Sequence, residues 1–296
     1  MKFYAKNIAI IIPTNGISNT IYRVLDSITS QSTKPGQVII ISTKCNEFKS
    51  FKNFHFIHSK KKNQVYQRNL AKKYIKKNIK LILQLDDYVM LEKNALKHLI
   101  NEWNKSDKNV IGIGLFPSNY YPPKPNLIKK ILDKNVLKPG RVLKSGYVTA
   151  WGKNFFTDET EWLNGGSTSW KYNKNIFIRR YPIIKWSVAE DVIFSYKKNK
   201  KLRLKLAKKS KVKYLKRQNL NNLFESCKKG FFLSKVIKNF LIYNKNLSIV
   251  NFYISTFFLS LSGIAHSLLI FNINKFSFNI GRFIGLWLKT YNYKIK

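Results

Sequence analysis

Apolar runs and amphipathic stretches alternate along the first part of the chain. Residues 8–12 form a continuous apolar run, as a strand buried on both faces of a parallel sheet requires. Helical spacing follows, with Asn19 as the expected cap, until the turn at residues 34–36 leads to a second apolar run at 38–42. The apolar face of this helix comprises Ile21, Val24, Leu25 and Ile28. The pattern predicts a strand, a helix and a second strand.

The same alternation continues up to residue 116. Further strands are predicted at residues 54–59, 80–85 and 110–116. A basic helix is predicted at residues 64–77 with Tyr66, Leu70 and Tyr74 on one face. The buried face of the next helix is predicted to comprise Ala95, Leu96, Leu99, Ile100 and Trp103. This order predicts a doubly wound α/β sheet, which binds ligands beyond the carboxyl ends of its strands.

Two adjacent carboxylates, Asp86 and Asp87, directly follow the apolar run at residues 81–85. Two carboxylates in a cleft repel each other and lose hydration unless a positive group joins them. A divalent cation, Mg²⁺ or Mn²⁺, would do so, and it would share its remaining positions with water and the phosphates of a nucleotide diphosphate. The alternative is that Asp87 favours the N-terminus of a following helix while Asp86 is solvated.

Five short motifs within residues 7–215 have the order and spacing of one known family. Residues 8–41 contain an apolar strand ending in Pro-Thr, a helix, and a strand introduced by Pro. The other motifs are NQVYQRNLA at 63–71, LQLDDYVML at 83–91, WLNGGSTSWKYNKNIF at 162–177 and AEDVIFSYKKNKK at 189–201. Together they resemble the family 2 glycosyltransferases, inverting enzymes of the GT-A fold, of the type that builds bacterial cell-surface glycans.

The resemblance implies a GT-A-like doubly wound mixed sheet with helices on both faces. It also implies transfer of a sugar, with inversion, from a nucleotide-sugar donor to a glycan or lipid-linked acceptor. The processive Q..RW signature is absent after Asp191, so transfer of a single sugar is expected. The residues that the resemblance places at the donor are Pro13, Thr14, Arg68, Asn69, Asp86, Gly165 and Gly166, and those that it places at a Mn²⁺ or Mg²⁺ ion are Asp86 and Asp87.

The resemblance further implies that Asp191 is the general base, which takes the proton of the acceptor hydroxyl, and that Glu190 orients the acceptor or the base. Both residues precede the helical pattern of Val192, Ile193 and Tyr196. The dipole at a helix N-terminus helps to keep such carboxylates ionised. An acidic helix start without a catalytic role is the alternative.

Two positions depart from the family pattern. Ser42 stands where members commonly carry an Asp that contacts the nucleotide base, and Tyr88 stands at the third position of the usual acidic triplet. An inactive sugar-binding relative is therefore a second interpretation. On the acceptor side, Trp151 and Trp162 have the aromatic faces that cover the apolar side of a sugar, and the alternative is that they fill the core.

Composition adds a strong positive charge, because 55 Lys and Arg against 14 Asp and Glu give a net charge of +41. This charge predicts a polyanionic partner, which is an anionic membrane, a phosphorylated substrate or nucleic acid, unless it forms a generally solvated basic surface. Nucleic acid is disfavoured because the sequence has no zinc spacing, RNP signature or helix-turn-helix cue. A dinucleotide oxidoreductase is disfavoured because the first strand leads into PTNGISN instead of G-x-G-x-x-G.

The cysteine content and the N-terminus predict a reducing compartment. Cys45 and Cys227 are too few and too distant for a disulfide framework, and the four histidines have no metal-ligand spacing. The apolar run after Lys2 and Lys6 is too short for a signal peptide.

The C-terminal part of the chain contains an uncharged stretch at residues 247–271, between Lys245 and Lys275. Its length suits a membrane span, although Asn251, His266 and several serines dilute it. A pair of helices in the membrane interface is the other expectation, and a buried hairpin is the alternative. With the net charge, the stretch predicts attachment to the cytoplasmic face of the membrane. The expected domains are 1–215, with a donor half at 1–116 and an acceptor half at 117–215, and C-terminal helices at 216–296.

Overall fold

The computed structural model describes residues 2–44, 54–122, 127–173, 187–198, 202–216 and 222–288. The chain forms two compact units. Unit 1 comprises Met1–Pro122 and Trp151–Arg217, and unit 2 comprises Pro123–Ala150 and Gln218–Lys296. The division differs from the predicted boundaries, because residues 123–150, expected in the acceptor half, belong to the same unit as the C-terminal helices.

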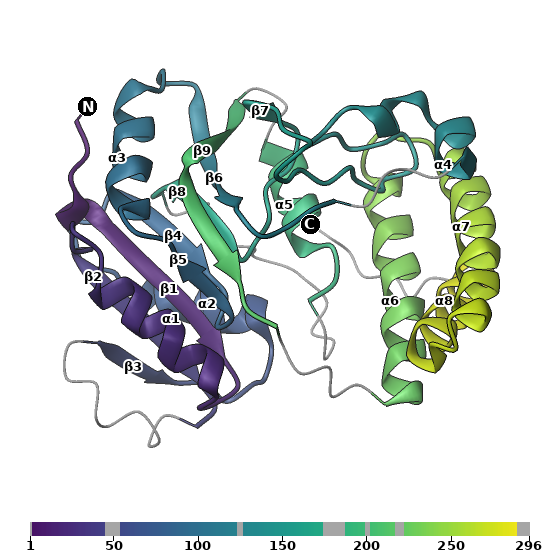
Figure 1. The fold of residues 1–296 in the computed structure, drawn as a ribbon, viewed down its shortest axis with the longest axis horizontal. Coiled ribbons are helices and arrows are strands. Elements are labelled where there is room, and N and C mark those ends of the chain that lie inside the picture. The colour runs from purple at the N-terminus through teal and green to yellow at the C-terminus, as the bar shows by residue number, and fades with distance from the viewer. Residues whose placement is uncertain are drawn as a thin grey trace. The chain divides into compact units, whose positions relative to one another are not determined.

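The described residues of unit 1 are built on one mixed sheet of nine strands (Figure 1). Strands β3, β2, β1 and β4 are parallel neighbours, and β8 lies antiparallel between β4 and β6. Strand β9 runs parallel to β6 and pairs antiparallel with both β5 and β7. The bounds are β1 (Ile8–Thr14), β2 (Gln37–Ser42), β3 (His55–His58), β4 (Leu81–Leu85), β5 (Val89–Leu91), β6 (Val110–Pro117), β7 (Glu159–Thr160), β8 (Ser167–Lys171) and β9 (Arg203–Tyr214). The five strands predicted before residue 117 are confirmed, and the sheet is mixed as expected.

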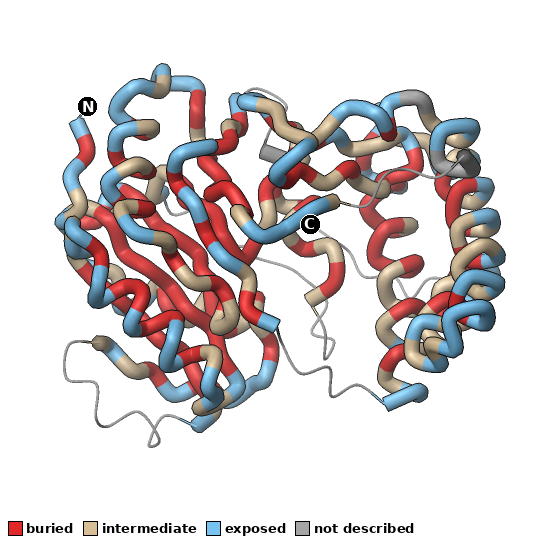
Figure 2. Tube along the Cα trace, viewed as in Figure 1, coloured by how far each residue is buried: buried red, intermediate tan, exposed pale blue. Residues whose placement is uncertain are grey.

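Alternate residues of the central strands face two layers of the core. Ile8, Ile10 and Ile12 of β1 join one apolar cluster with residues of α1 (Asn19–Thr29) and α3 (Ala95–Lys105). Ala9 and Ile11 are equally buried but lie outside this cluster, on the face where α2 (Gln64–Ala71) contacts β1 and β2. The central strands are therefore buried on both faces, as Figure 2 shows for unit 1. This two-sided burial explains why their sequences are continuously apolar.

Two of the three predicted helix faces are confirmed, and the third is not. All four predicted residues of α1 and all five of α3 are buried, so both faces are confirmed. The predicted cap of α1 is wrong, because the side chain of Ser18, and not that of Asn19, accepts a hydrogen bond from the Ile21 N–H. The predicted face of the second helix is also wrong, since Tyr74 is exposed and the buried residues of α2 are Val65, Gln67, Arg68 and Ala71.

Several shorter elements are also present among the described residues. A short strand, β5, follows Asp86 and Asp87, and α3 begins only at Ala95, so the alternative that Asp87 lies at a helix N-terminus is wrong. The other short elements are η1 (Ala5–Asn7), η3 (Lys72–Tyr74), α4 (Leu127–Leu132), η4 (Lys134–Leu137) and α5 (Glu190–Lys198).

Unit 2 contains three long helices, α6 (Leu223–Ile242), α7 (Ile249–Leu269) and α8 (Ile273–Trp287). Glycines bring α6 and α8 into backbone contact: a Cβ added at Gly230 would lie 1.9 Å from the Phe278 carbonyl oxygen, and one at Gly281 would lie 1.9 Å from that of Cys227. In the part of the chain that the structure describes, one helix, α7, is long and apolar enough to cross a membrane.

Candidate active site

The carboxylates predicted at a strand end lie where the parallel strands β1 and β4 finish side by side. Asp86 is buried, and its N–H donates to the Gly166 carbonyl oxygen at 3.0 Å. Asp87 Oδ2 accepts a hydrogen bond from Thr14 Oγ1 at 2.8 Å. Thr14 is the last residue of β1, and its neighbour Pro13 is buried in the same strand. The sheet therefore brings together residues that are far apart in the sequence.

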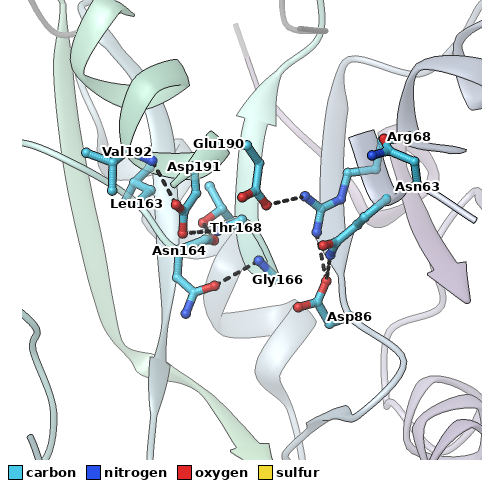
Figure 3. Close-up of polar contacts among 12 residues, drawn as sticks. Asn63, Arg68, Asp86, Leu163, Asn164, Gly166, Thr168, Glu190, Asp191 and Val192 are labelled. Atoms are coloured by element: carbon cyan, nitrogen blue, oxygen red, sulfur yellow. Dashed lines mark hydrogen bonds and ion pairs between the residues drawn. The ribbon is translucent and has the colours of Figure 1, made fainter. Parts of the chain in front are cut away.

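Arg68 is a buried cation between two of the site carboxylates (Figure 3). Its Nη2 lies 2.7 Å from Asp86 Oδ1, and its Nη1 lies 3.6 Å from Glu190 Oε1. Gln64, one turn earlier in α2, donates to the same Asp86 oxygen. The Nε of Arg68 is buried without a hydrogen-bond partner among the described residues. Arg68 thus supplies, at Asp86, the positive group that the paired carboxylates need.

Gly165 and Gly166 lie close to these groups, and a side chain on Gly166 would collide with Asp86. A Cβ on Gly166 would lie 2.2 Å from Asp86 Oδ2, and a Cβ on Gly165 would lie 3.1 Å from Arg68 Nη1. The Gly166 N–H donates to Asn164 Oδ1 at 2.9 Å, which fixes the turn into β8. Gly166 is therefore required for the close approach of the chain to Asp86, and the contact of both glycines with a donor sugar stays a prediction.

Glu190 and Asp191 form the first turn of α5. Asp191 Oδ1 accepts a hydrogen bond from the Val192 N–H at 2.8 Å, and Oδ2 accepts one from the Gly165 N–H at 3.4 Å. Ala189, directly before them, has a φ of 56°, in the left-handed region that costs a residue with a side chain about 1 kcal/mol or more. Such strain is commonly found where a fold holds functional groups in place.

Burial controls the ionisation of these two carboxyl groups. It raises the pKa of Glu190 to about 8, with the negative charge of Asp191 adding to the rise and Arg68 opposing it. Burial also raises the pKa of Asp191, against the effect of its two backbone donors. Near neutral pH a protonated Glu190 leaves fewer like charges around Asp191.

These residues line one pocket within unit 1. Its polar side includes Arg68, Asn69, Glu190 and Asp191, and its apolar side includes Trp170 and Phe194, whose ring centroids lie 4.9 Å apart. Other lining residues are Val65, Gln84, Leu163, Gly165 and Ser195. The buried Trp170 Nε1 has no hydrogen-bond partner in the described ranges. Aromatic walls with a few convergent polar groups are typical of small-ligand sites.

The protein ligands available to a cation at this site are two carboxylates. Within the described residues, no three His, Cys, Asp or Glu side chains come together as a metal-binding group. Tyr88, at the third triplet position, packs its ring 6.2 Å from that of Tyr214. Asp86 and Asp87 fit Mg²⁺ or Mn²⁺, since these ions commonly take one or two carboxylates and complete their coordination with phosphate and water.

Comparison with known proteins identifies the fold. No protein-family model and no curated protein matches the sequence. Among solved structures, mannosyltransferase PcManGT from Pyrobaculum calidifontis, in complex with GDP-Man and Mn²⁺, superposes with a TM-score of 0.57 at 10% identity, covering 95% of this chain and 87% of that chain. GalNAc-T7, with UDP, GalNAc and Mn²⁺, superposes with a TM-score of 0.59 at 12% identity. The chain has a GT-A-type glycosyltransferase fold.

This result confirms the expected fold class. The superposition on GalNAc-T7 covers 95% of this chain and 55% of that one, so the chain spans about half the length of that protein. At these identities the likeness establishes the GT-A fold, and the roles of individual residues stay predictions.

The structure shows the surroundings of three further residues from the sequence analysis, Ser42, Trp151 and Trp162. Ser42, the departure at the end of β2, is fully buried and accepts a hydrogen bond from the Lys44 N–H at 3.0 Å. Trp151 and Trp162 are buried against each other, with ring centroids 4.5 Å apart. Their packing agrees with the alternative that they fill the core, and an acceptor-binding role stays a prediction.

Several polar residues of the site were given no role in the sequence-based prediction. Gln67 Nε2 donates to the Thr14 carbonyl oxygen at 2.9 Å and joins α2 to the end of β1. The Tyr214 hydroxyl lies 3.1 Å from both Asn164 Nδ2 and Ser167 Oγ, and burial raises the pKa of this phenol. The spacing of Gln64, Gln67 and Arg68 on one helix face was an available signal, but an apolar face was assumed instead.

Proposed function

We propose that this protein transfers a single sugar, with inversion, from a nucleotide-sugar donor to a glycan or lipid-linked acceptor. The observation that carries the proposal is the position of Asp191 in the pocket of a GT-A fold, with two backbone N–H groups holding its carboxylate. An inverting transfer needs one carboxylate beside the acceptor hydroxyl and a separate group of residues for the leaving diphosphate. Asp191 lines the pocket, and Asp86 lies beside Arg68, which lines the same pocket.

Asp191 is the proposed general base. The acceptor oxygen forms a bond to the anomeric carbon while the bond from that carbon to the diphosphate oxygen breaks, and Asp191 takes the hydroxyl proton. The raised pKa of Asp191 favours this role, since a base is more effective when its pKa approaches the working pH. Glu190, protonated near neutral pH, can donate a hydrogen bond to the acceptor or to Asp191.

Asp86 and Asp87 are the proposed ligands of a divalent cation on the donor side. Both solved structures described above contain Mn²⁺, which supports this assignment. A bound cation would neutralise charge on the leaving diphosphate. Arg68 holds Asp86 at 2.7 Å and keeps one of its oxygens in place, while Thr14 does the same for Asp87. Pro13, Asn69, Gly165 and Gly166 are proposed to surround the donor.

The first experiment is a search for the donor with the full chain. Thermal shift against a panel of nucleotide sugars, with Mn²⁺ and with EDTA, should give a rise in unfolding midpoint for one donor class only when Mn²⁺ is present. Calorimetry with that donor then measures the metal dependence directly. Equal affinity in EDTA and Mn²⁺ would contradict the metal role of Asp86 and Asp87, and the absence of binding across the panel would contradict the donor class itself.

We also propose that the reaction takes place at the cytoplasmic face of a membrane. Nucleotide sugars are cytosolic molecules, and the net charge of +41 suits an anionic acceptor or lipid surface.

A further inference from the structure

Helix α7 buries mostly polar side chains and exposes apolar ones, which is the reverse of the usual arrangement in a water-soluble protein. Its buried residues are mostly small and polar, namely Phe252, Ser255, Thr256, Ser260 and Ser267. Its outer face exposes large apolar side chains, which we name the α7 stripe: Val250, Ile254, Phe258, Leu261, Leu268 and Leu269. A helix on the surface of a soluble domain normally buries its apolar face and exposes its polar one. Figure 2 shows exposed residues along the length of this helix.

The hydroxyl groups on the inner face have partners inside unit 2. Arg282 of α8 donates from Nε to Ser260 Oγ at 3.0 Å, and from Nη2 to the Leu259 carbonyl oxygen. The Tyr147 and Thr256 hydroxyl oxygens lie 2.9 Å apart. Unit 2 therefore uses the polar side of α7 for its own packing. Nothing in this packing accounts for the apolar stripe on the other side.

The stripe continues beyond the end of the helix. Phe271, in the turn after α7, is 92% exposed, and Ile273, the first residue of α8, is 63% exposed. The stripe from Val250 to Leu269 extends about 28 Å at 1.5 Å per residue. Soluble proteins rarely expose a continuous apolar surface of this size unless it binds a partner or a membrane.

The positive charge around the α7 stripe favours an anionic partner. Between residues 223 and 288 the only acidic residue is Glu225, whereas the basic residues are Lys228, Lys229, Lys235, Lys238, Lys245, Lys275 and Arg282. A second copy of the chain would bring an equal positive charge to the same place. An anionic lipid surface attracts such lysines by about 1 kcal/mol each when they lie near it.

We propose that the α7 stripe inserts into the interface of an anionic bilayer, with the axis of α7 lying along the membrane plane. An apolar helix face in this position enters about 5–10 Å, to the boundary between headgroups and acyl chains. The inference does not depend on the proposed catalytic function. In this arrangement the rest of unit 2 stays outside the hydrocarbon, whereas a membrane span of the unit would bring it inside.

The neighbouring helices argue against a span. The Gly281 and Gly230 contacts hold α8 against α6, and α8 also packs along α7. Helix α6 carries Lys228, Lys229, Lys235 and Lys238 within its bounds. A span of the whole unit would take these lysines into hydrocarbon, at a cost of about 2.5–3.5 kcal/mol or more for each charge near the centre. Insertion of the stripe alone avoids this cost.

Flotation with vesicles tests the attachment. The full chain is mixed with phosphatidylcholine vesicles, with or without phosphatidylglycerol, in 0.1 M and 1 M NaCl. We expect binding to anionic vesicles that largely survives 1 M NaCl, because inserted side chains are not screened. The variant Ile254→Ser/Phe258→Ser/Leu261→Ser should lose at least tenfold of the partitioning at 1 M NaCl. The control Tyr4→Ser/Tyr74→Ser, which removes exposed aromatics from unit 1, should bind like the wild type.

Two outcomes would overturn the attachment. Binding of the stripe variant equal to that of the wild type would show that the lysines alone are responsible. Sedimentation of a wild-type dimer that the stripe variant lacks, without vesicle binding by either, would assign the stripe to a second copy. Circular dichroism of the variants checks that the exposed substitutions leave the helices intact.

Depth measurement tests the orientation. Spin labels are placed at Val250→Cys, Phe258→Cys and Leu269→Cys in a Cys45→Ser/Cys227→Ser background, and their access to a lipid-soluble relaxation agent is compared. A helix along the membrane plane should give similar shallow depths at all three positions. A deep centre with two shallow ends would show a span and overturn the proposed orientation.

Discussion

Arg68 is the residue that holds the candidate site together. It contacts Asp86, directly after β4, and Glu190 of α5 from a third element, α2, and it is buried. Truncating one partner of a buried ion pair leaves an uncompensated charge, which is commonly destabilising by several kcal/mol. Substitution of Arg68 would therefore affect stability and activity together. Substitutions of the carboxyl groups are more informative.

Asp191→Asn should abolish sugar transfer and leave donor binding nearly intact. The amide has the same shape and cannot take the hydroxyl proton, so turnover should fall about a hundredfold or more. Initial rates together with donor affinity by calorimetry measure the two effects separately. The control is Asp26→Asn, at an exposed position of α1. Retention of turnover by Asp191→Asn would remove the general-base assignment.

Glu190→Gln should change how stability depends on pH. The pKa of Glu190 is raised from its ordinary 4.5 to about 8 in the folded protein, so the folded state binds a proton more tightly than the unfolded chain. Its contribution to stability is complete below about pH 4.5 and is lost as the pH rises through about 8. Gln cannot ionise, so the variant should gain stability relative to the wild type between pH 5 and pH 9, by an amount on the order of a few kcal/mol.

Denaturant unfolding of wild type and Glu190→Gln across that pH range measures the difference. Glu161→Gln, at a half-buried carboxyl outside the Arg68 cluster, serves as the control for the loss of a carboxylate. A constant difference between Glu190→Gln and wild type at every pH would contradict the raised pKa.

At the scale of elements, the close contact between two helices requires glycine at particular positions. Helices α6 and α8 approach until glycine is required on both, at Gly230 and at Gly281. Small residues at such a contact allow the two helix backbones to approach each other closely.

Gly281→Ala should destabilise unit 2 even though alanine is the better helix former. Helix propensity favours Ala by about 1 kcal/mol, but its Cβ would lie 1.9 Å from the Cys227 carbonyl oxygen. Forced separation of packed elements costs about 1–3 kcal/mol, so the net effect should be a loss of stability.

Gly263→Ala is the matched control, because its Cβ would meet the amide end of the Asn279 side chain instead of backbone. It should cost less than Gly281→Ala in denaturant unfolding. Stabilisation by Gly281→Ala would show that α6 and α8 do not approach this closely.

At the scale of the whole molecule, the net charge of +41 should oppose folding through self-repulsion. Raising the salt from 0.1 M to 1 M shortens the Debye length from about 10 Å to about 3 Å and screens this repulsion. The midpoint of thermal unfolding should therefore rise, by roughly 2–4 °C for each kcal/mol gained. Scans in NaCl and KCl at equal ionic strength should agree. A midpoint that stays constant or falls would indicate that the lysines are too well separated to repel.

The sequence by itself determined the elements whose buried residues recur at a regular spacing along the chain. The apolar runs of β1 and β2 and the buried faces of α1 and α3 follow from it, because each depends on neighbours a few residues apart. The position of Asp86 and Asp87 after β4 follows for the same reason. The family motifs added the expectation of a GT-A fold, which the structural superpositions confirm.

Only the tertiary structure decided which polar groups meet. The buried face of α2 includes Arg68 and Gln67 because they pair with Asp86, directly after β4, and with Thr14 of β1. A hydrophobic period cannot reveal such partners in distant segments. Likewise, residues 123–150 belong with the C-terminal helices through contacts such as that of Tyr147 with Thr256. The inner face of α7 is polar for the same physical reason. Hydrogen bonds and ion pairs between distant segments depend on three-dimensional distance, whereas periodicity records only which side of an element is buried.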